Sequence, residues 1–315
     1  MWRVRQRGAI LCHMRASELH GVIAAIVTPF DARDRLDDAA LRRVTRHVME
    51  GGGDAIMTAG GTGEFPHLTR EEKRRVAQAA VEETRGRIPV IAGTAACSTR
   101  EAVELCQDAA QAGAAAVILT PPFYFPLPDR ALYEHFAIVA RESPVPVVVY
   151  NNPLYTGNDL KPSLIAELAG LDNVIGLKQS NSDLGALVEV IRLAGDRISL
   201  CTGIDSQFYP ALCVGARGIF STAACVIPRE MAAIYRAFRA GDHAAALAEH
   251  MRVQALNRYF EYDPGYVAPC KEALEMLGVG AGKVRKPMPD LTAEEREGIR
   301  RALGDLGYQV RGAAA

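Results

Sequence analysis

The sequence has few lysines, no paired cysteines and no long apolar segment, and each of these absences narrows what the protein can be. No run approaches the roughly 18 apolar residues of a membrane helix, so no membrane partner is expected. The net charge of -1 provides no field that would attract nucleic acid, so no nucleic-acid partner is expected either. The seven cysteines form no Cys-x-x-Cys pair, and the seven histidines show no His-x-x-x-His spacing. This pattern predicts reduced thiols in a cytoplasmic protein and indicates no metal site.

The first residues read as an addition to the main fold. Three arginines precede a short apolar stretch at residues 8–12, which is too short for a signal peptide. Met14 opens a more ordinary start directly before the first expected strand, so residues 1–13 are either a disordered extension or a misassigned start. We expect residues 1–20 as a whole to form a disordered N-terminal extension.

Residues 21–240 alternate between short apolar or β-branched runs and amphipathic stretches, which is typical of parallel strands joined by helices. An open, doubly wound sheet fits this alternation, but eight strands and no Gly-x-Gly-x-x-Gly turn after the first one favour a (β/α)8 TIM barrel. Beyond residue 240 the alternation stops, and residues 241–315 are expected to form a C-terminal helical domain. The expected strands are 22–27, 55–58, 89–92, 116–119, 146–150, 174–178, 198–201 and 218–220.

Lys178 closes the apolar run at residues 173–177, where a charged amine has no structural reason to be. The chain has only six lysines, and the other five lie in polar, helical or proline-rich surroundings. Burial favours the neutral amine, and a neutral amine is a nucleophile toward carbonyl groups. We therefore expect Schiff-base chemistry at Lys178. A lysine that extends its amine from a strand end into solvent is the structural alternative.

Two further elements are expected at the same carboxyl face of the barrel, where reactive side chains gather. The glycine-rich loop at residues 60–64 has backbone N–H groups and the Thr62 hydroxyl that are suited to hold a carboxylate, although for the loop taken alone a tight turn that needs glycine is the simpler explanation. Tyr150 ends a strand next to Lys178 and is suited to shuttle protons for an imine, although a core tyrosine fits as well. Glu64 is expected to be structural, as an ion-pair partner or a cap near the next helix.

Taken together, these residues resemble a known family. The segments Gly60-Gly-Thr-Gly-Glu64-Phe65, Tyr150-Asn-Asn-Pro-Leu-Tyr-Thr-Gly157 and Gly176-Leu-Lys178 look like motifs of the dihydrodipicolinate synthase/N-acetylneuraminate lyase family. The resemblance covers residues 21–306, and the spacing between the last two motifs is that of the family. It implies a (β/α)8 barrel with C-terminal helices, a homotetramer built as a dimer of dimers, and no cofactor.

The resemblance also implies residue roles. Carried over by position, Lys178 forms the Schiff base with pyruvate or another 2-oxo acid, and Tyr150 relays protons. Gly61 and Thr62 hold the carboxylate of the 2-oxo acid. The loop at residues 120–126 is similar to the family segment that supplies a tyrosine across a dimer interface. An ungapped match places Phe123 at that position, and the adjacent Tyr124 is the substrate-binding candidate.

Two departures from the family pattern bear on the substrate. Gly61 stands where many members have a Thr or Ser hydroxyl, so the usual relay beyond Tyr150 is interrupted, and the loop is similar to that of dehydratases of deoxy-oxo sugar acids. Tyr155 replaces the arginine with which dihydrodipicolinate synthases bind the carboxylate of their second substrate. Both departures weaken the synthase interpretation.

We therefore expect a class I Schiff-base lyase, specifically an aldolase or dehydratase of 2-keto-3-deoxy sugar acids or hydroxy-oxo acids. The alternative enzyme is a 4-hydroxy-tetrahydrodipicolinate synthase, which uses pyruvate and aspartate semialdehyde. An alternative of another class is a non-catalytic 2-oxo-acid sensor, against which Lys178 and Tyr150 argue. Polar side chains that are expected either to face a polyol or to cap loops are Asn151, Asn152, Ser180, Asn181 and Thr202.

Overall fold

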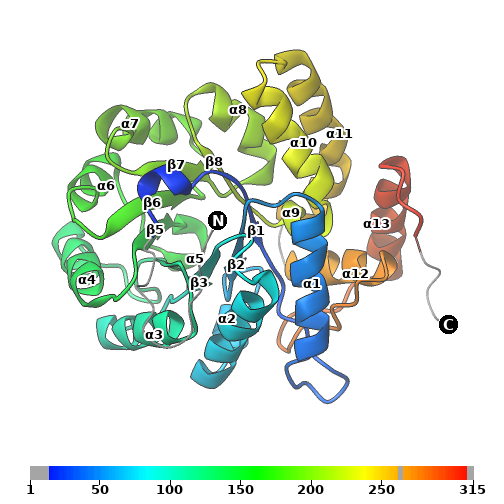
Figure 1. Cartoon of the computed structure of the whole chain (residues 1–315), viewed down its shortest axis with the longest axis horizontal. Coiled ribbons are helices and arrows are strands. Elements are labelled where there is room, and N and C mark those ends of the chain that lie inside the picture. The colour runs from blue at the N-terminus through cyan, green and yellow to red at the C-terminus, as the bar shows by residue number, and fades with distance from the viewer. Residues whose placement is uncertain (1–13, 262–264, 311–315) are drawn as a thin grey trace.

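The computed structural model describes residues 14–261 and 265–310. Within these ranges, eight parallel strands close into a barrel in chain order, and β8 pairs back with β1 (Figure 1). The expected (β/α)8 barrel is confirmed, and the open-sheet alternative is wrong. The strands are β1 Gly21–Ala25, β2 Ala55–Thr58, β3 Val90–Gly93, β4 Ala116–Leu119, β5 Val147–Asn151, β6 Val174–Gln179, β7 Ser199–Thr202 and β8 Gly218–Ser221.

Each strand has the barrel interior on one side and the surrounding helices on the other, so its apolar residues are buried on both faces. This is why the strands read as continuous apolar runs rather than as alternating ones. Ile23, Met57, Ile91, Ile118 and Val148 fill the interior below the carboxyl face. The barrel interior is therefore a packed core and not a pore, and the polar carboxyl ends of the strands lie at its mouth.

Helices cover the outside of the barrel as a ring (Figure 1). Their starts follow from local capping; for example, the Thr69 side chain accepts the Glu72 N–H and Glu72 returns the bond to the Thr69 N–H. The covering helices are α1 Asp38–Glu50, α2 Arg70–Thr84, α3 Thr99–Gln111, α4 Asp129–Glu142, α6 Pro162–Leu168, α7 Leu184–Ala194, α8 Phe208–Cys213 and α10 Pro228–Arg239. Two four-residue helices, α5 Pro153–Thr156 and α9 Ala223–Val226, were not expected, because one turn is too short to show an amphipathic period.

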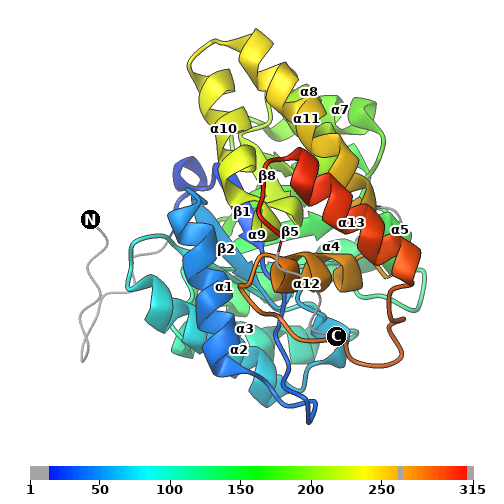
Figure 2. The same cartoon turned by 90° about the vertical axis from the view of Figure 1, so that its right-hand side faces the viewer.

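Three further helices follow the barrel and lie along one side of it (Figure 2). They are α11 His243–Glu261, α12 Val267–Met276 and α13 Ala293–Asp305. Helix α11 packs on α10, and α12 packs on α9, which follows the last strand. The expected C-terminal helices are therefore present, and α12 lies close to the carboxyl face of the barrel.

The N-terminal expectation needs a correction. Residues 1–13 lie outside the described residues, but Met14 and Leu19 are buried against the interior core of the barrel. The Ser199 hydroxyl donates a hydrogen bond to the Leu19 carbonyl, and Leu19 also occupies the space next to Gly176. A disordered extension therefore does not reach residue 20, because residues 14–20 cover the amino-terminal end of the barrel with apolar side chains.

Candidate active site

Lys178 and Tyr150 lie side by side at the carboxyl face, because the register of β5 and β6 pairs these two residues directly. The Lys178 side chain is buried, with 6% of its surface exposed. Its Nζ lies 4.2 Å from the centre of the Tyr150 ring and 5.7 Å from the centre of the Phe220 ring. The amine is thus enclosed by aromatic faces at the mouth of the barrel, and it does not extend into bulk water.

Gly203, directly after β7, makes room for the amine. A Cβ at this position would lie 2.5 Å from Lys178 Cε and closer still to the Ser180 Oγ. The Ser180 Oγ is buried and has no hydrogen-bond partner among the described residues. A buried hydroxyl normally has a partner, so this oxygen is suited to bind a ligand beside Lys178.

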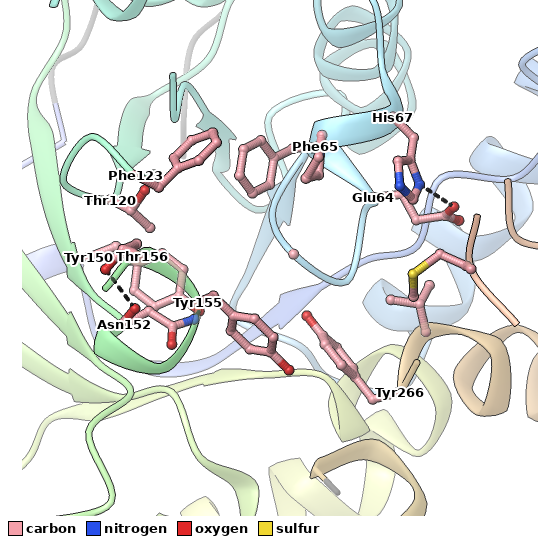
Figure 3. A pocket seen from close by; sticks show the side chains of 14 residues that line it. Glu64, Phe65, His67, Thr120, Phe123, Tyr150, Asn152, Tyr155, Thr156 and Tyr266 are labelled. Atoms are coloured by element: carbon pink, nitrogen blue, oxygen red, sulfur yellow. Dashed lines mark hydrogen bonds and ion pairs between the residues drawn. The ribbon is translucent and has the colours of Figure 1, made fainter. Parts of the chain in front are cut away.

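The hydroxyl of Tyr150 accepts a hydrogen bond of 2.9 Å from Asn152 Nδ2 (Figure 3). Asn151 does not face the site with Tyr150, because successive residues of a strand point to opposite sides. Its side-chain amide donates instead to Asp159 Oδ1 and the Leu160 carbonyl. The polyol interpretation of Asn151 is therefore wrong.

Thr202 is another strand-end residue that turns away from the site. Its Oγ1 accepts the Ile204 N–H at 3.2 Å and its side chain is fully buried, so it caps a loop. Asn152, Ser180 and Asn181 do line the cavity that contains Lys178.

The glycine-rich loop lies opposite Lys178, and Gly61 and Thr62 line the same cavity. The Thr62 hydroxyl lies 2.8 Å from the Thr222 hydroxyl, which fixes the loop against the segment that follows β8. Glu64 adopts a left-handed backbone conformation, and its carboxylate forms an ion pair of 2.6 Å with the buried Lys271 of α12. The structural role expected for Glu64 agrees with this geometry.

Two adjoining cavities open at this face. The cavity with Lys178 has a volume of about 400 Å³ and a partly polar wall, whereas its neighbour of about 270 Å³ is mainly apolar, with Phe65 and Phe123 in its wall (Figure 3). Lys178 is the single Lys or Arg side chain among the described residues that line them. The residues shared by the two cavities are Gly61, Tyr150, Asn152, Tyr155 and Tyr266.

An acidic pair, Asp205 and Glu261, forms part of the wall that contains Lys178. Asp205 is almost fully buried and accepts hydrogen bonds from the Ser221 hydroxyl and the Thr222 N–H. Burial, together with the nearby charge of Glu261, raises the pKa of Asp205 to about 7. Burial likewise raises the pKa of Glu261, which accepts the Ser206 N–H. Sequence reasoning missed both residues, although an acidic residue just after a strand end was a usable signal for Asp205.

Tyr124 lines neither of the two cavities. Its side chain is 85% exposed, and its backbone has a positive φ of 87°. The neighbouring Phe123 lines the apolar cavity and packs edge-on against Phe65. A role for Tyr124 across a subunit interface stays a prediction.

The comparisons with known proteins agree with this geometry. A family model described as the Dihydrodipicolinate synthetase family matches residues 18–306. The chain belongs to this family. It is 39% identical over 291 residues to a 4-hydroxy-tetrahydrodipicolinate synthase of Halorhodospira halophila, which covers 91% of this chain and 97% of that protein.

Solved structures give the same result. The dihydrodipicolinate synthase of Aquifex aeolicus superimposes with a TM-score of 0.89 at 33% identity, covering 93% of this chain and all of that one. The chloride-inhibited dihydrodipicolinate synthase of Acinetobacter baumannii, complexed with pyruvate, superimposes with a TM-score of 0.88 at 31% identity, covering 92% and 99%. The protein is therefore a Schiff-base-forming enzyme of this lyase family, and the sensor alternative is not supported.

Two negative findings complete the description. None of the helices in residues 14–261 and 265–310 is both long and apolar enough to cross a membrane. The same part of the chain contains no group of three or more His, Cys, Asp or Glu side chains placed to bind a metal ion.

Proposed function

We propose that the protein is an aldolase or dehydratase of 2-keto-3-deoxy sugar acids that works through a Schiff base on Lys178. The observation that supports this most is the charge of the cavity wall, in which Lys178 is the single Lys or Arg side chain among the described lining residues. A second substrate carboxylate would face Asp205 and Glu261 without a cation to pair with. Hydroxyl groups, in contrast, match neutral side chains such as Ser180 and Asn181.

The first chemical steps follow from the position of the amine. The Lys178 Nζ attacks the C2 carbonyl of the 2-oxo acid, and loss of water from the carbinolamine gives the imine. The Tyr150 hydroxyl, oriented by Asn152 Nδ2, supplies and removes the protons of these steps. The loop with Gly61 and Thr62 holds the carboxylate at C1 through its backbone N–H groups and the Thr62 hydroxyl.

The protonated imine then acts as an electron sink for one of two bond cleavages. In an aldolase, the C4 hydroxyl loses its proton and the C3–C4 bond breaks, which gives an aldehyde and the enamine of pyruvate. In a dehydratase, C3 loses a proton to form the enamine, and the C4–O bond then breaks with release of water. In the aldolase, protonation of the enamine at C3 restores the imine of pyruvate. Hydrolysis of the imine then frees Lys178 in both cases.

A second candidate is the lysine-pathway synthase, which joins pyruvate to aspartate semialdehyde. The relatives named 4-hydroxy-tetrahydrodipicolinate synthase, at 36–39% identity, favour it. The wall of the cavity argues against it, since Tyr155 is neutral where a cation would bind the carboxylate of the second substrate.

A substrate panel separates the two candidates. We expect kcat/KM for a 2-keto-3-deoxy sugar acid to exceed that for pyruvate with aspartate semialdehyde by about 10-fold or more. A tenfold ratio corresponds to a difference of about 1.4 kcal/mol in transition-state binding. The Lys178→Ala variant is the inactive control. A Tyr155→Arg variant, which adds a cation to the wall, should raise the relative activity with aspartate semialdehyde. A clear preference of the wild type for aspartate semialdehyde would contradict the proposal.

We further propose that the protein is a cytoplasmic homotetramer, a dimer of dimers. Support for an interface comes from large apolar side chains that are exposed near the active-site face, namely Tyr124 at 85%, Phe125 at 67% and Leu154 at 78%. Light scattering on the wild type should give a tetramer, and Phe125→Asp should give smaller species. A monomeric wild type would contradict this assembly.

A further inference from the structure

We infer that the Tyr266 hydroxyl, from the start of helix α12, contacts the part of the substrate beyond C3 and so selects for hydroxylated 2-oxo acids. This inference rests on the proposed Schiff-base function. A Cβ at Gly61 would lie 2.5 Å from the Tyr266 hydroxyl oxygen, so this oxygen occupies the volume in which any other residue at position 61 would place its side chain. Helix α12 thus places the Tyr266 hydroxyl beside Gly61, a loop position that has no side chain.

The location of Tyr266 suits a contact with a long substrate better than one with pyruvate. Tyr266 lines both cavities, and so do Tyr150, Asn152 and Tyr155, so it stands where the two cavities meet. The rings of Tyr155 and Tyr266 lie next to each other, with centroids 6.4 Å apart, although they come from different parts of the chain (Figure 3). Gly61 and Tyr150, which act on the pyruvate part of every substrate, also line this junction, so the contact that distinguishes a longer acid comes from the Tyr155 side, where the Tyr155 and Tyr266 rings adjoin.

The position of Tyr266 relative to the loop is fixed by a buried ion pair. Lys271, five residues after Tyr266 in α12, pairs with Glu64 at 2.6 Å, and both side chains are almost fully buried. The second carboxylate oxygen of Glu64 accepts the Arg285 N–H at 2.9 Å, and the Lys271 amine also donates to the Lys283 carbonyl. Since Glu64 lies three residues after Gly61, this network joins α12 rigidly to the loop. A rigid donor is what selection between similar substrates requires.

The chemistry of a phenol agrees with this role. A tyrosine hydroxyl both donates and accepts hydrogen bonds, which matches a substrate hydroxyl. A site that hydrogen-bonds a substrate hydroxyl discriminates strongly against an analogue without that hydroxyl.

The first test compares Tyr266→Phe with the wild type on two readouts. We expect kcat/KM for a 2-keto-3-deoxy sugar acid to fall about 10-fold, as for one lost hydrogen bond, while the rate of borohydride trapping of pyruvate on Lys178 stays unchanged. Tyr308→Phe is the matched control, because Tyr308 belongs to the same C-terminal region but donates to Glu230 and lines neither cavity. It should alter neither readout.

The second test is a rescue that a purely structural role cannot produce. The Gly61 backbone lies outside the left-handed region, and once the phenol oxygen is removed the nearest remaining atom to a new Cβ is Tyr266 Cζ at 3.8 Å. A serine therefore fits in Gly61→Ser/Tyr266→Phe and returns a hydroxyl to the same volume. We expect this double variant to recover part of the lost kcat/KM. Gly61→Ser alone should lower it, because the serine collides with the Tyr266 hydroxyl.

The outcomes separate this inference from the proposed function. If the wild type forms the pyruvate adduct and Tyr266→Phe turns over the sugar acid as well as the wild type, the inference is wrong and the Schiff-base function stands. Loss of both trapping and turnover in a folded Tyr266→Phe variant also overturns it, because Tyr266 would then act on the step shared by all substrates. If the wild type forms no adduct, the proposed function itself fails.

Discussion

Two regions of the molecule contribute to the candidate site, and they position their side chains by different means. The barrel places Tyr150 beside Lys178 through strand register, so the backbone hydrogen bonds of β5 and β6 set the distance between them. The C-terminal helices place Tyr266 beside Gly61 through side-chain packing and the ion pair of Lys271 with Glu64. The Schiff-base chemistry therefore depends on strand register in the barrel, whereas the proposed substrate selection depends on the joint between the two regions, which is the contact of Tyr266 with Gly61 and the ion pair of Lys271 with Glu64.

The largest expected effect comes from removing the nucleophile of the barrel. Lys178→Arg keeps a cation but has no neutral amine, so kcat should fall by about 10⁴-fold or more. Steady-state kinetics on the best substrate of the panel measures this. Lys286→Arg, at an exposed ion pair with Asp290, should retain full activity. Substantial activity in Lys178→Arg would show that Lys178 is not the nucleophile.

Removal of the ion pair between Lys271 and Glu64 should lower the stability of the fold strongly. Lys271→Met leaves the Glu64 carboxylate buried without its cation, which should lower the free energy of unfolding by about 3–5 kcal/mol. Burial lowers the pKa of Lys271, and the Glu64 carboxylate opposes that shift, so the pair depends on close contact. Urea unfolding of the purified variant gives the value.

Two controls make this result specific to the buried pair. Glu64→Gln/Lys271→Met should lose less stability than Lys271→Met, because no unpaired charge remains. Lys286→Met removes an exposed pair instead and should cost less than about 1 kcal/mol. Equal losses in Lys271→Met and Lys286→Met would show that the joint does not depend on the buried pair.

Loss of the Tyr150 hydroxyl, the proposed proton relay in the barrel, is expected to have a somewhat smaller effect on catalysis. Tyr150→Phe removes the hydroxyl that Asn152 orients, and kcat should fall by about 10²-fold, as is usual for the loss of an acid–base group. The borohydride adduct should still form, but more slowly. Tyr133→Phe on α4 is a control outside both cavities. An unchanged kcat in Tyr150→Phe would assign proton transfer to another group.

Much of the barrel was predictable from the sequence, and the reasons are local. Each strand is buried on both faces, so it appears as an apolar run, and Lys178 stands out at the end of one of them. The polyol interpretation of Asn151 is wrong because side chains alternate along β5, which turns Tyr150 inward and Asn151 away.

The contributions of the C-terminal region were not predictable in the same way. Tyr266 and Glu261 approach the site from helices whose packing is set by tertiary contacts, and no motif or spacing in the sequence connects them to Gly61 or Asp205. The covalent order of the chain specifies register between neighbouring strands, but it does not specify which helix end meets which loop. Only the folded arrangement shows that the glycine at position 61 and the phenol at position 266 share one volume.

The smallest expected effect concerns the pH dependence of the acidic pair. The folded pKa of Asp205, about 7, lies above its ordinary value of 3.8, so its contribution to stability is present at low pH and is lost as the pH rises from about 4 to 7. Glu261→Gln removes the neighbouring charge and should reduce this loss by about 1 kcal/mol, or about 2 °C in Tm.

Thermal unfolding of the wild type and Glu261→Gln at pH 5 and pH 8 measures this difference. Glu249→Gln, on the same helix but outside the cavity, should keep the pH dependence of the wild type. The same pH dependence in Glu261→Gln as in the wild type would mean that the two carboxyl groups are not coupled.

We expect Lys178 to form a covalent imine with a 2-oxo acid. Borohydride reduction in the presence of pyruvate, followed by peptide mass spectrometry, tests it most directly. We predict a single modified peptide that contains Lys178, and no modification when Lys178→Arg is treated in the same way. An unmodified Lys178 peptide, or a modification on another lysine instead, would contradict the account.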